Sequence, residues 1–194
     1  MKRDTRSTKP IQSSFLSFEK DVETILKKLF VENYPYSENL KKLLVINSKD
    51  CLDNNDSEII KKTIAEMSLS KLRKEGYIKL EPKIRMEEHE EIKAYIIITM
   101  DNFIPNDLNP YYRDCTISFD ILCHTDYWDI GNYRLRPLKI AGYIDGILNE
   151  TKLSGIGTFN FMGCNQLILD ENLSGYTLMY RAVHGNDDRL AAEE

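Results

Sequence analysis

Apolar and polar residues alternate most regularly between Arg113 and Thr125. Side chains of a β-strand point alternately to its two faces, so this alternation predicts a strand with one buried face. The apolar face consists of Cys115, Ile117, Phe119, Ile121 and Cys123. The opposite face is polar except at Leu122, and it consists of Thr116, Ser118, Asp120, Leu122 and His124. We expect a helix to cover the apolar face.

The segment 136–149 is predicted to be this helix. Pro137 stands in its first turn, where the missing N–H group costs little, and apolar residues recur behind it at helical spacing. The inner stripe consists of Leu138, Ala141, Ile144, Ile147 and Leu148. We predict that the helix crosses the strand and packs on Ile117, Phe119 and Ile121.

The part of the chain before Gly76 follows the helical period. An apolar stripe predicts a first helix over residues 14–32. Ser37 is expected to cap a second helix, and either Asp56 or Ser57 to cap a third. The apolar residues of the third helix are Ile59, Ile60, Ile64 and Met67. Gly76 is predicted to end the helical region.

After Gly76 the pattern changes to that of strands. The predicted strands, besides the one described above, cover residues 77–80, 91–100, 157–169 and 175–183. Residues 101–109 contain Asp, Asn and Pro and are expected to form a loop. Strands that follow one another through loops usually pair antiparallel. The sequence therefore predicts an α+β fold, an antiparallel β-sheet with helices packed on one face, preceded by a helical N-terminal region.

The predicted organisation has four parts. They are a flexible basic arm (1–13), a helical N-terminal region (14–76), a domain of antiparallel sheet plus crossing helix (77–184) and a flexible tail (185–194). The 194 residues, 42% hydrophobic and 29% charged, are ordinary for a soluble globular protein. The formal net charge of −5 lacks the basic excess of a general nucleic-acid binder. No apolar run approaches the roughly 20 residues of a membrane span, and the polar N-terminus does not fit a secretory signal.

Candidates for chemistry are weak. The sequence contains no phosphate-binding loop, nucleophile elbow or HExxH motif, and its three histidines include no close pair. The best cluster is Asp120, Cys123, His124 and Asp126, of which Cys123 points to the opposite face of the strand from His124. His124 and Asp126 would lie about 6.5 Å apart in a continued strand, but Asp120 would lie about 13 Å from His124. We expect no catalytic residue, no cofactor and no metal ligand, and we interpret the cluster as a polar rim. A small enzyme or ligand-binding protein that uses this rim is the remote alternative.

Four cysteines stand at positions 51, 115, 123 and 164 without a CxxC pair. Cys115 and Cys123 share a strand face but would lie about 27 Å apart along the strand. A disulfide requires Cα atoms within about 7 Å, which excludes this pair. Reduced, buried thiols are expected.

Aromatic residues gather in the connections that flank the alternating strand. Tryptophan and tyrosine in loops are enriched at protein–protein contacts. The candidate interface residues are Phe103, Tyr111, Tyr112, Tyr127, Trp128 and Tyr133. Our hypothesis is that loop 101–112 and connection 126–133 contact a neighbouring molecule. The alternative is that some of these aromatic residues cover the end of the core.

Three segments, CTISFDILCHTD (115–126), YRLRPLKIAGYIDGILN (133–149) and LSGIGTFNF (153–161), resemble a known family when taken together. The family comprises the tail-terminator (tail-completion) and neck proteins of long-tailed bacteriophages. The resemblance covers residues 91–183, about half of the chain. It implies an antiparallel sheet, a crossing helix after the third strand and a closing hairpin.

The resemblance also implies a structural role without enzymatic activity. Such proteins form a ring, commonly a hexamer, that caps the tail tube at its head-proximal end and joins it to the head–tail connector. The implied partners are further copies of the chain, the tail tube protein and the head–tail connector or stopper protein. DNA is implied only as passing cargo, and no membrane is involved. The implied location is the head–tail junction of the virion, with the host cytoplasm during assembly. Because the helical N-terminal part is longer than expected for the smallest members of this family, another head-completion or connector assembly protein of the virion is the alternative.

Overall fold

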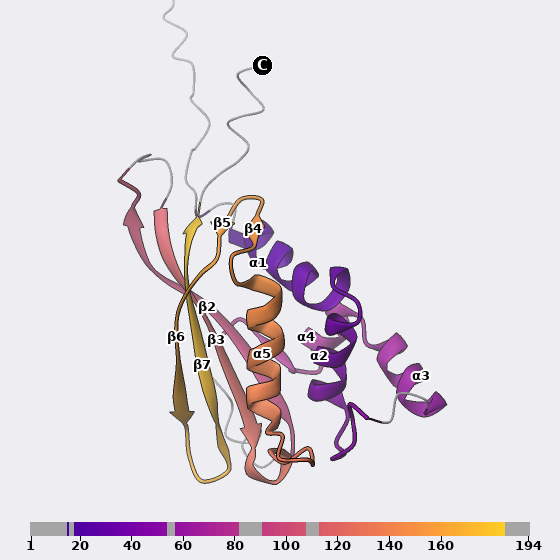
Figure 1. Cartoon of the computed structure of the whole chain (residues 1–194). Helices are drawn as coiled ribbons and strands as arrows, with labels where there is room; N and C mark the ends of the chain where they lie inside the picture. Colours follow the sequence, from indigo (N-terminus) through magenta and orange to yellow (C-terminus); the bar gives the residue numbers. More distant parts are fainter. Residues whose placement is uncertain (1–14, 16–17, 54–56, 82–90, 108–112, 185–194) are drawn as a thin grey trace, which may run out of the picture.

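The computed structural model describes residues 15, 18–53, 57–81, 91–107 and 113–184. It consists of a five-stranded sheet with helices on one face, which confirms the predicted α+β class (Figure 1). The helices are α1 (Phe18–Lys27), its π-helical continuation η2 (Lys28–Glu32), α2 (Tyr36–Val45), α3 (Glu58–Glu66), α4 (Leu69–Lys74) and α5 (Arg136–Leu148). None of the helices that the structure describes is long and apolar enough to cross a membrane.

The strands of the main sheet are β1 (Ile78–Lys79), β2 (Ala94–Pro105), β3 (Arg113–His124), β6 (Asn160–Ile168) and β7 (Leu173–His184). Their order in the sheet is β1-β2-β3-β7-β6. A separate two-stranded sheet is formed by β4 (Lys152–Leu153) and β5 (Gly157–Thr158). The predicted strand over 113–125 is confirmed as β3, and the closing hairpin as β6 and β7.

Two features of the sheet differ from the prediction. β1 pairs parallel with β2, whereas every other pair in the main sheet is antiparallel. The predicted loop over 101–109 is wrong at its start, because β2 continues to Pro105 through an irregular pairing between Asp101 and Ile104. Asn102 adopts a positive φ of 52° there, a conformation that asparagine tolerates better than most residues. The turn formers therefore mark a bulge inside the strand.

The helical region follows the prediction with three corrections. The first helix ends near Glu32 as expected, and Ser57 caps α3 by accepting the Ile60 N–H group. Ser37 does not cap α2, which begins one residue earlier, and its hydroxyl accepts the N–H group of Asn33 instead. A separate helix, α4, begins at Leu69 because the hydroxyl of Ser68 accepts the Lys71 N–H group.

The third correction concerns exposure. Ile59 on α3 is 79% exposed, although its neighbour Ile60 is buried. Leu138 on α5 is 43% exposed, and Ile140 takes the expected inner position with 0% exposure. The helix is predicted correctly in both cases, but a shift of one or two residues moves a side chain to another face. Gly76 ends the helical region as predicted, with a φ of 77° that favours glycine.

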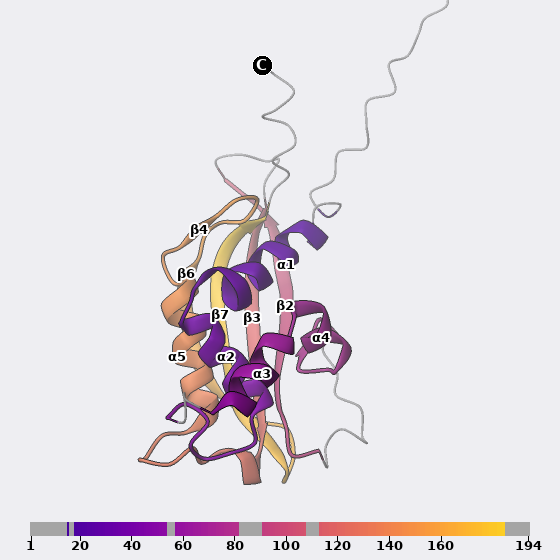
Figure 2. The ribbon, with the colours of Figure 1, turned by 90° about the vertical axis from the view of Figure 1, so that its right-hand side faces the viewer.

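The core lies between the helices and one face of the sheet, and Figure 2 shows α1 and α2 in front of that face. Ile117, Phe119 and Ile121 are 0% exposed, and α5 contributes to the same apolar cluster, as predicted. Burial of Phe119 alone stabilises the fold by about 2 kcal/mol on area grounds. Leu29, Phe30, Leu40, Leu43 and Leu44 belong to this cluster too. The helical region and the sheet therefore share one core.

The opposite face of the sheet carries a second, smaller apolar cluster. Leu122, the exception in the alternating pattern, packs there with Tyr95, Ile97 and Leu173. Gly175 lies opposite Leu122 on β7, and a Cβ atom at this position would stand 1.8 Å from the carbonyl oxygen of Ile121. The close approach of β7 to β3 therefore requires glycine at position 175.

The four cysteines have free thiols. Cys51, Cys115 and Cys123 are buried as predicted, and burial raises the pKa of Cys123 to about 12. Cys164 is a correction, because it is exposed on β6, the edge strand of the sheet.

Candidate functional site

The connection between β3 and α5 forms a compact loop at one end of the sheet. Its backbone closes on itself through an isolated β-bridge between Asp129 and Leu135. Ile130 donates its N–H group to the Arg134 carbonyl at 3.1 Å, and Arg134 donates to the Gly131 carbonyl at 2.9 Å. The Asp129 carboxylate accepts the Gly131 N–H group at 2.8 Å. We call residues 129–135 the tip loop.

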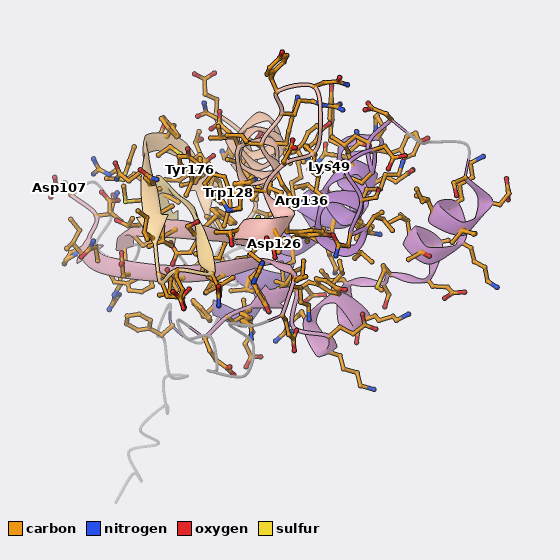
Figure 3. The ribbon with its side chains drawn as sticks, turned by 90° about the horizontal axis from the view of Figure 1, so that it is seen from below. Lys49, Asp107, Asp126, Trp128, Arg136 and Tyr176 are labelled. Atoms are coloured by element: carbon orange, nitrogen blue, oxygen red, sulfur yellow. The ribbon has the colours of Figure 1, made fainter. Side chains whose placement is uncertain are left out.

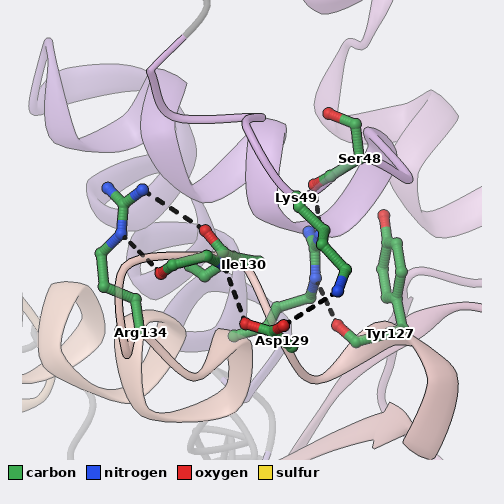
Figure 4. Close-up of polar contacts among 8 residues, drawn as sticks. Ser48, Lys49, Tyr127, Asp129, Ile130 and Arg134 are labelled. Carbon is green, nitrogen blue, oxygen red and sulfur yellow. Dashed lines mark hydrogen bonds and ion pairs between the residues drawn. The ribbon is translucent and has the colours of Figure 1, made fainter.

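Two ion pairs tie the tip loop to the segment that follows α2, and Figure 4 shows the one between Lys49 and Asp129. Lys49 Nζ lies 3.0 Å from Asp129 Oδ2, and the Arg134 guanidinium binds the Asp53 carboxylate through two nitrogens. The hydrogen bond from Arg134 lowers the pKa of Asp53, and the one from Lys49 lowers the pKa of Asp129. Lys49 and Asp129 are more than half exposed, so this pair orients the loop and adds little to stability.

Arg136 lies directly behind the tip loop and is 1% exposed. Its guanidinium donates to the carbonyl oxygens of Leu43 at 2.7 Å, Ile46 at 3.3 Å and Ser48 at 3.0 Å. It also donates to the Tyr127 carbonyl at 2.7 Å and lies 3.6 Å from the centre of the Tyr127 ring. These bonds satisfy carbonyl groups at the end of α2 and hold the helical region against the connection. Figure 3 shows Arg136 at the same end of the molecule as Lys49 and Trp128.

Tyr133 belongs to the tip loop and is fully exposed. Gly131, Asn132 and Tyr133 have consecutive positive φ values of 74°, 51° and 59°. This conformation costs a non-glycine residue roughly 1–2 kcal/mol, and most of all a bulky one. The hydrogen bonds and ion pairs of the loop hold Tyr133 in this conformation, with its ring in solvent.

The other predicted interface residues have different environments. Tyr127 is a correction, because it is 2% exposed and belongs to the core, where burial raises its pKa. Trp128 is half-buried, donates its indole N–H group to the Cys123 carbonyl at 3.2 Å and lies against the Tyr176 ring. Phe103 is half-buried on β2, with its ring 5.0 Å from that of Phe15. Tyr111 and Tyr112 lie outside the described residues.

The polar rim, which the sequence offered as a candidate for catalysis, has side chains that are held by hydrogen bonds to nearby groups. His124 is 8% exposed, and its Nδ1 accepts the N–H group of Asp126. The Asp126 carboxylate lies 3.8 Å from the same nitrogen. Asp120 accepts a hydrogen bond from the hydroxyl of Thr177 on β7. Among the described residues, no group of three His, Cys, Asp or Glu side chains is placed to hold a metal ion.

A hollow of about 1360 Å³ lies between α1, α4 and β1. Glu19 and Glu23 line it from α1, and Arg73 and Lys74 line it from α4. Apolar side chains of α1 and β1 line it too, and the lining residues within the described part of the chain include no histidine or cysteine. The hollow therefore has the character of a groove with charged rims.

Comparison with known proteins identifies the family of this chain. A family model, YomW, matches residues 37–182. The chain belongs to the YomW family. This family derives from SPbeta-like prophages, so the chain is a protein of bacteriophage origin. No curated protein and no solved structure matches the chain.

The part of the chain that the YomW family covers runs from α2 to β7 and includes the tip loop, Arg136 and the segment after α2. It also includes β6, which the sequence predicted as a strand but not as a surface of interest. Phe161, Met162 and Ile168 on β6 are 46%, 56% and 69% exposed. The available signal was the composition of Asn160–Ile168, a strand of nine residues without a charged side chain.

Proposed function

We propose that this YomW-family protein forms a ring at the head-proximal end of a phage tail. In this role, as tail terminator or neck protein, it caps the tail tube and joins it to the head–tail connector. The bacteriophage origin of the family and the sheet, crossing helix and hairpin of the fold support the proposal. The observation that carries it is the tip loop, which presents Tyr133 to solvent on a fixed backbone.

A ring requires two different patches on each subunit that match head to tail. A rigid loop with an exposed tyrosine is suited to be one of them, because tyrosine adds contact area at a small cost in side-chain entropy. The strained backbone at Tyr133 favours the same interpretation, since strain of this kind is concentrated at functional positions. Further copies of the chain, the tail tube protein and the connector are the proposed partners.

The charge of the protein agrees with DNA as passing cargo. A formal net charge of −5 gives no general attraction to the phosphate backbone. A channel through which DNA slides must not bind the phosphate backbone tightly. The proposed ring therefore guides DNA without holding it.

The test compares Tyr133→Ala with the wild type and with two controls. Tyr133→Phe keeps the ring of the side chain, and Tyr36→Ala removes a tyrosine that is 53% exposed elsewhere. We expect Tyr133→Ala alone to lower the mass of the assembly in light scattering, or to reduce the joining of heads to tails at least tenfold. Wild-type mass together with wild-type joining in Tyr133→Ala contradicts the role of the tip loop.

A second candidate is another head-completion or connector assembly protein of the virion. The family match begins at residue 37 and so includes α2, α3 and α4, which lie outside the sheet, crossing helix and hairpin of residues 91–183. A density map of the assembled virion separates the two candidates. The tail-terminator proposal requires this chain in direct contact with the last ring of the tail tube.

A further inference from the structure

The two edges of the main sheet are built differently. At one edge, β1 consists of only two residues, and β2 extends beyond it. The extension contains Asp101, a bulge before Ile104 and a final Pro105. Charged residues, bulges and proline are the devices by which proteins prevent the pairing of an open edge with another chain. This edge is protected.

The other edge, β6, has none of the charge or proline that protects β2. Its sequence, NFMGCNQLI, contains no charged residue and no proline. Within the described residues, its one neighbour in the sheet is β7. Phe161, Met162 and Ile168 expose about half or more of their surface on it. An uncharged edge strand of this length is a template for a further strand, and exposed apolar side chains favour its coverage.

We infer that the β6 edge pairs with the β6 edge of a second copy of this chain. Self-pairing of β6 brings no like charges together, because the strand carries no charge. The extension of β2 carries charge and proline, so the open edge without either that a second copy presents among its described residues is β6 itself. The contact is antiparallel and two-fold symmetric, extends over about 30 Å, and joins two five-stranded sheets into one.

The geometry of antiparallel pairs limits the register. The side chains of directly opposed residues project from the same face of the sheet. The two-fold axis therefore lies between one residue and the same residue of the second copy. Overlap of all nine residues places the axis at Cys164. The irregularity between Phe161 and Gly163 leaves Gly163–Ile168 as the regular part, whose central residues are Asn165 and Gln166. One of three residues, Cys164, Asn165 or Gln166, therefore faces its own copy.

This contact goes beyond the proposed ring. A two-fold contact uses the same patch on both subunits and closes after two copies, whereas a ring uses two different patches. The tip loop and β6 therefore act independently. Loss of β6 pairing lowers the mass without testing the role of Tyr133, and the two proposals can fail separately.

The first experiment measures the mass of the full-length protein by light scattering. Met162→Lys with Ile168→Lys places two charges on the β6 edge. The matched control, Val31→Lys with Ile59→Lys, places two charges at positions that are 60% and 79% exposed on η2 and α3. We expect the wild type and the control to be dimers or multiples of dimers, and the β6 variant to have half their mass. A monomeric wild type, or an equal mass in all three proteins, overturns the inference.

The second experiment identifies the surface directly. Opposed Cα atoms of antiparallel strands lie about 4.5–5.5 Å apart, which is within the range of a disulfide. Diamide oxidises two such thiols to a disulfide and takes up their two hydrogens. The proteins tested are the wild type, Cys164→Ser with Asn165→Cys, and Cys164→Ser with Gln166→Cys. Cys164→Ser alone reports the background from the three buried cysteines.

One of these three proteins is expected to form a covalent dimer on a denaturing gel, and Cys164→Ser is not. Failure of all three to cross-link, in a protein that light scattering shows to be dimeric, overturns pairing through β6. Circular dichroism and a cooperative unfolding transition establish that each variant is folded. The joining of heads to tails in the β6 variant reports separately on the proposed function.

Discussion

At the scale of single residues, Arg136 makes contacts that the hydrophobic pattern of the sequence does not predict. The sequence places it at the start of a helix, and the structure confirms that start. Its four carbonyl acceptors come from two separate parts of the chain, Tyr127 and the end of α2. Contacts of this kind depend on the tertiary fold, so local periodicity does not reveal them. The same reason explains why Tyr127 was predicted as an interface residue and is a core residue.

Replacement of Arg136 by lysine is expected to lower the free energy of unfolding by about 3 kcal/mol. Lysine keeps the charge but has no planar fork, so it cannot donate to the Tyr127 carbonyl and to the carbonyls at the end of α2 at the same time. Urea unfolding measures the difference. Lys139→Arg, at an exposed position of the same helix, is the control and is expected to change stability by less than about 0.5 kcal/mol. An equally small effect of Arg136→Lys contradicts the bridging role.

At the scale of elements, the sequence predicted those with strong local patterns. β3 and α5 follow their periods closely, and both are found where expected. The division between α3 and α4 was missed because a single serine, Ser68, makes it. The parallel pairing of β1 was missed because the direction of pairing depends on the path of the chain between strands. In the tip loop, the aromatic content of the sequence predicted Tyr133 as an interface residue. The positive φ values of its backbone could be seen only in the structure.

The ion pairs of the tip loop predict a dependence of stability on pH. The pKa values of Asp53 and Asp129 are lowered from the ordinary 3.8, so the unfolded chain binds more protons than the folded chain as the pH falls past that value. The stabilisation from the pairs is present at neutral pH and is lost as the pH falls through the lowered pKa values. Asp53→Asn with Asp129→Asn should be less stable than the wild type at neutral pH and equally stable at the acid limit.

Urea unfolding at a series of pH values measures this convergence. Asp50→Asn removes an exposed carboxylate from the same segment and is the control. Its difference from the wild type is expected to stay small throughout. A difference between the double variant and the wild type that does not change with pH contradicts an electrostatic origin.

At the scale of the whole molecule, the helices and the sheet form one body. The sequence divided the chain near residue 76 because the hydrophobic period changes there. The apolar cluster nevertheless includes side chains from both sides of that position, and Arg136 bonds across it. The predicted boundary therefore marks a change of secondary structure within a shared core. A pattern along the chain reports local periods, but it cannot report which elements share an interior.

A shortened protein tests this unity. Residues 77–184 alone lack α1 to α4, whose apolar side chains share one core with Ile96 and Ile98 of β2 in the full chain. We expect this fragment to lack a cooperative thermal transition and to aggregate, whereas the full chain unfolds in a single transition by calorimetry. A fragment that unfolds cooperatively near the temperature of the full chain contradicts the shared core.

The order of the strands also sets the order of events during synthesis. The central strand β3 pairs with β7, which is translated after α5 and β6. At roughly 5–20 residues per second, the ribosome completes β7 seconds after β3. The β6 edge arises in this same late hairpin. Nascent chains on one messenger RNA therefore present no finished β6 edge to one another until β7 has been made.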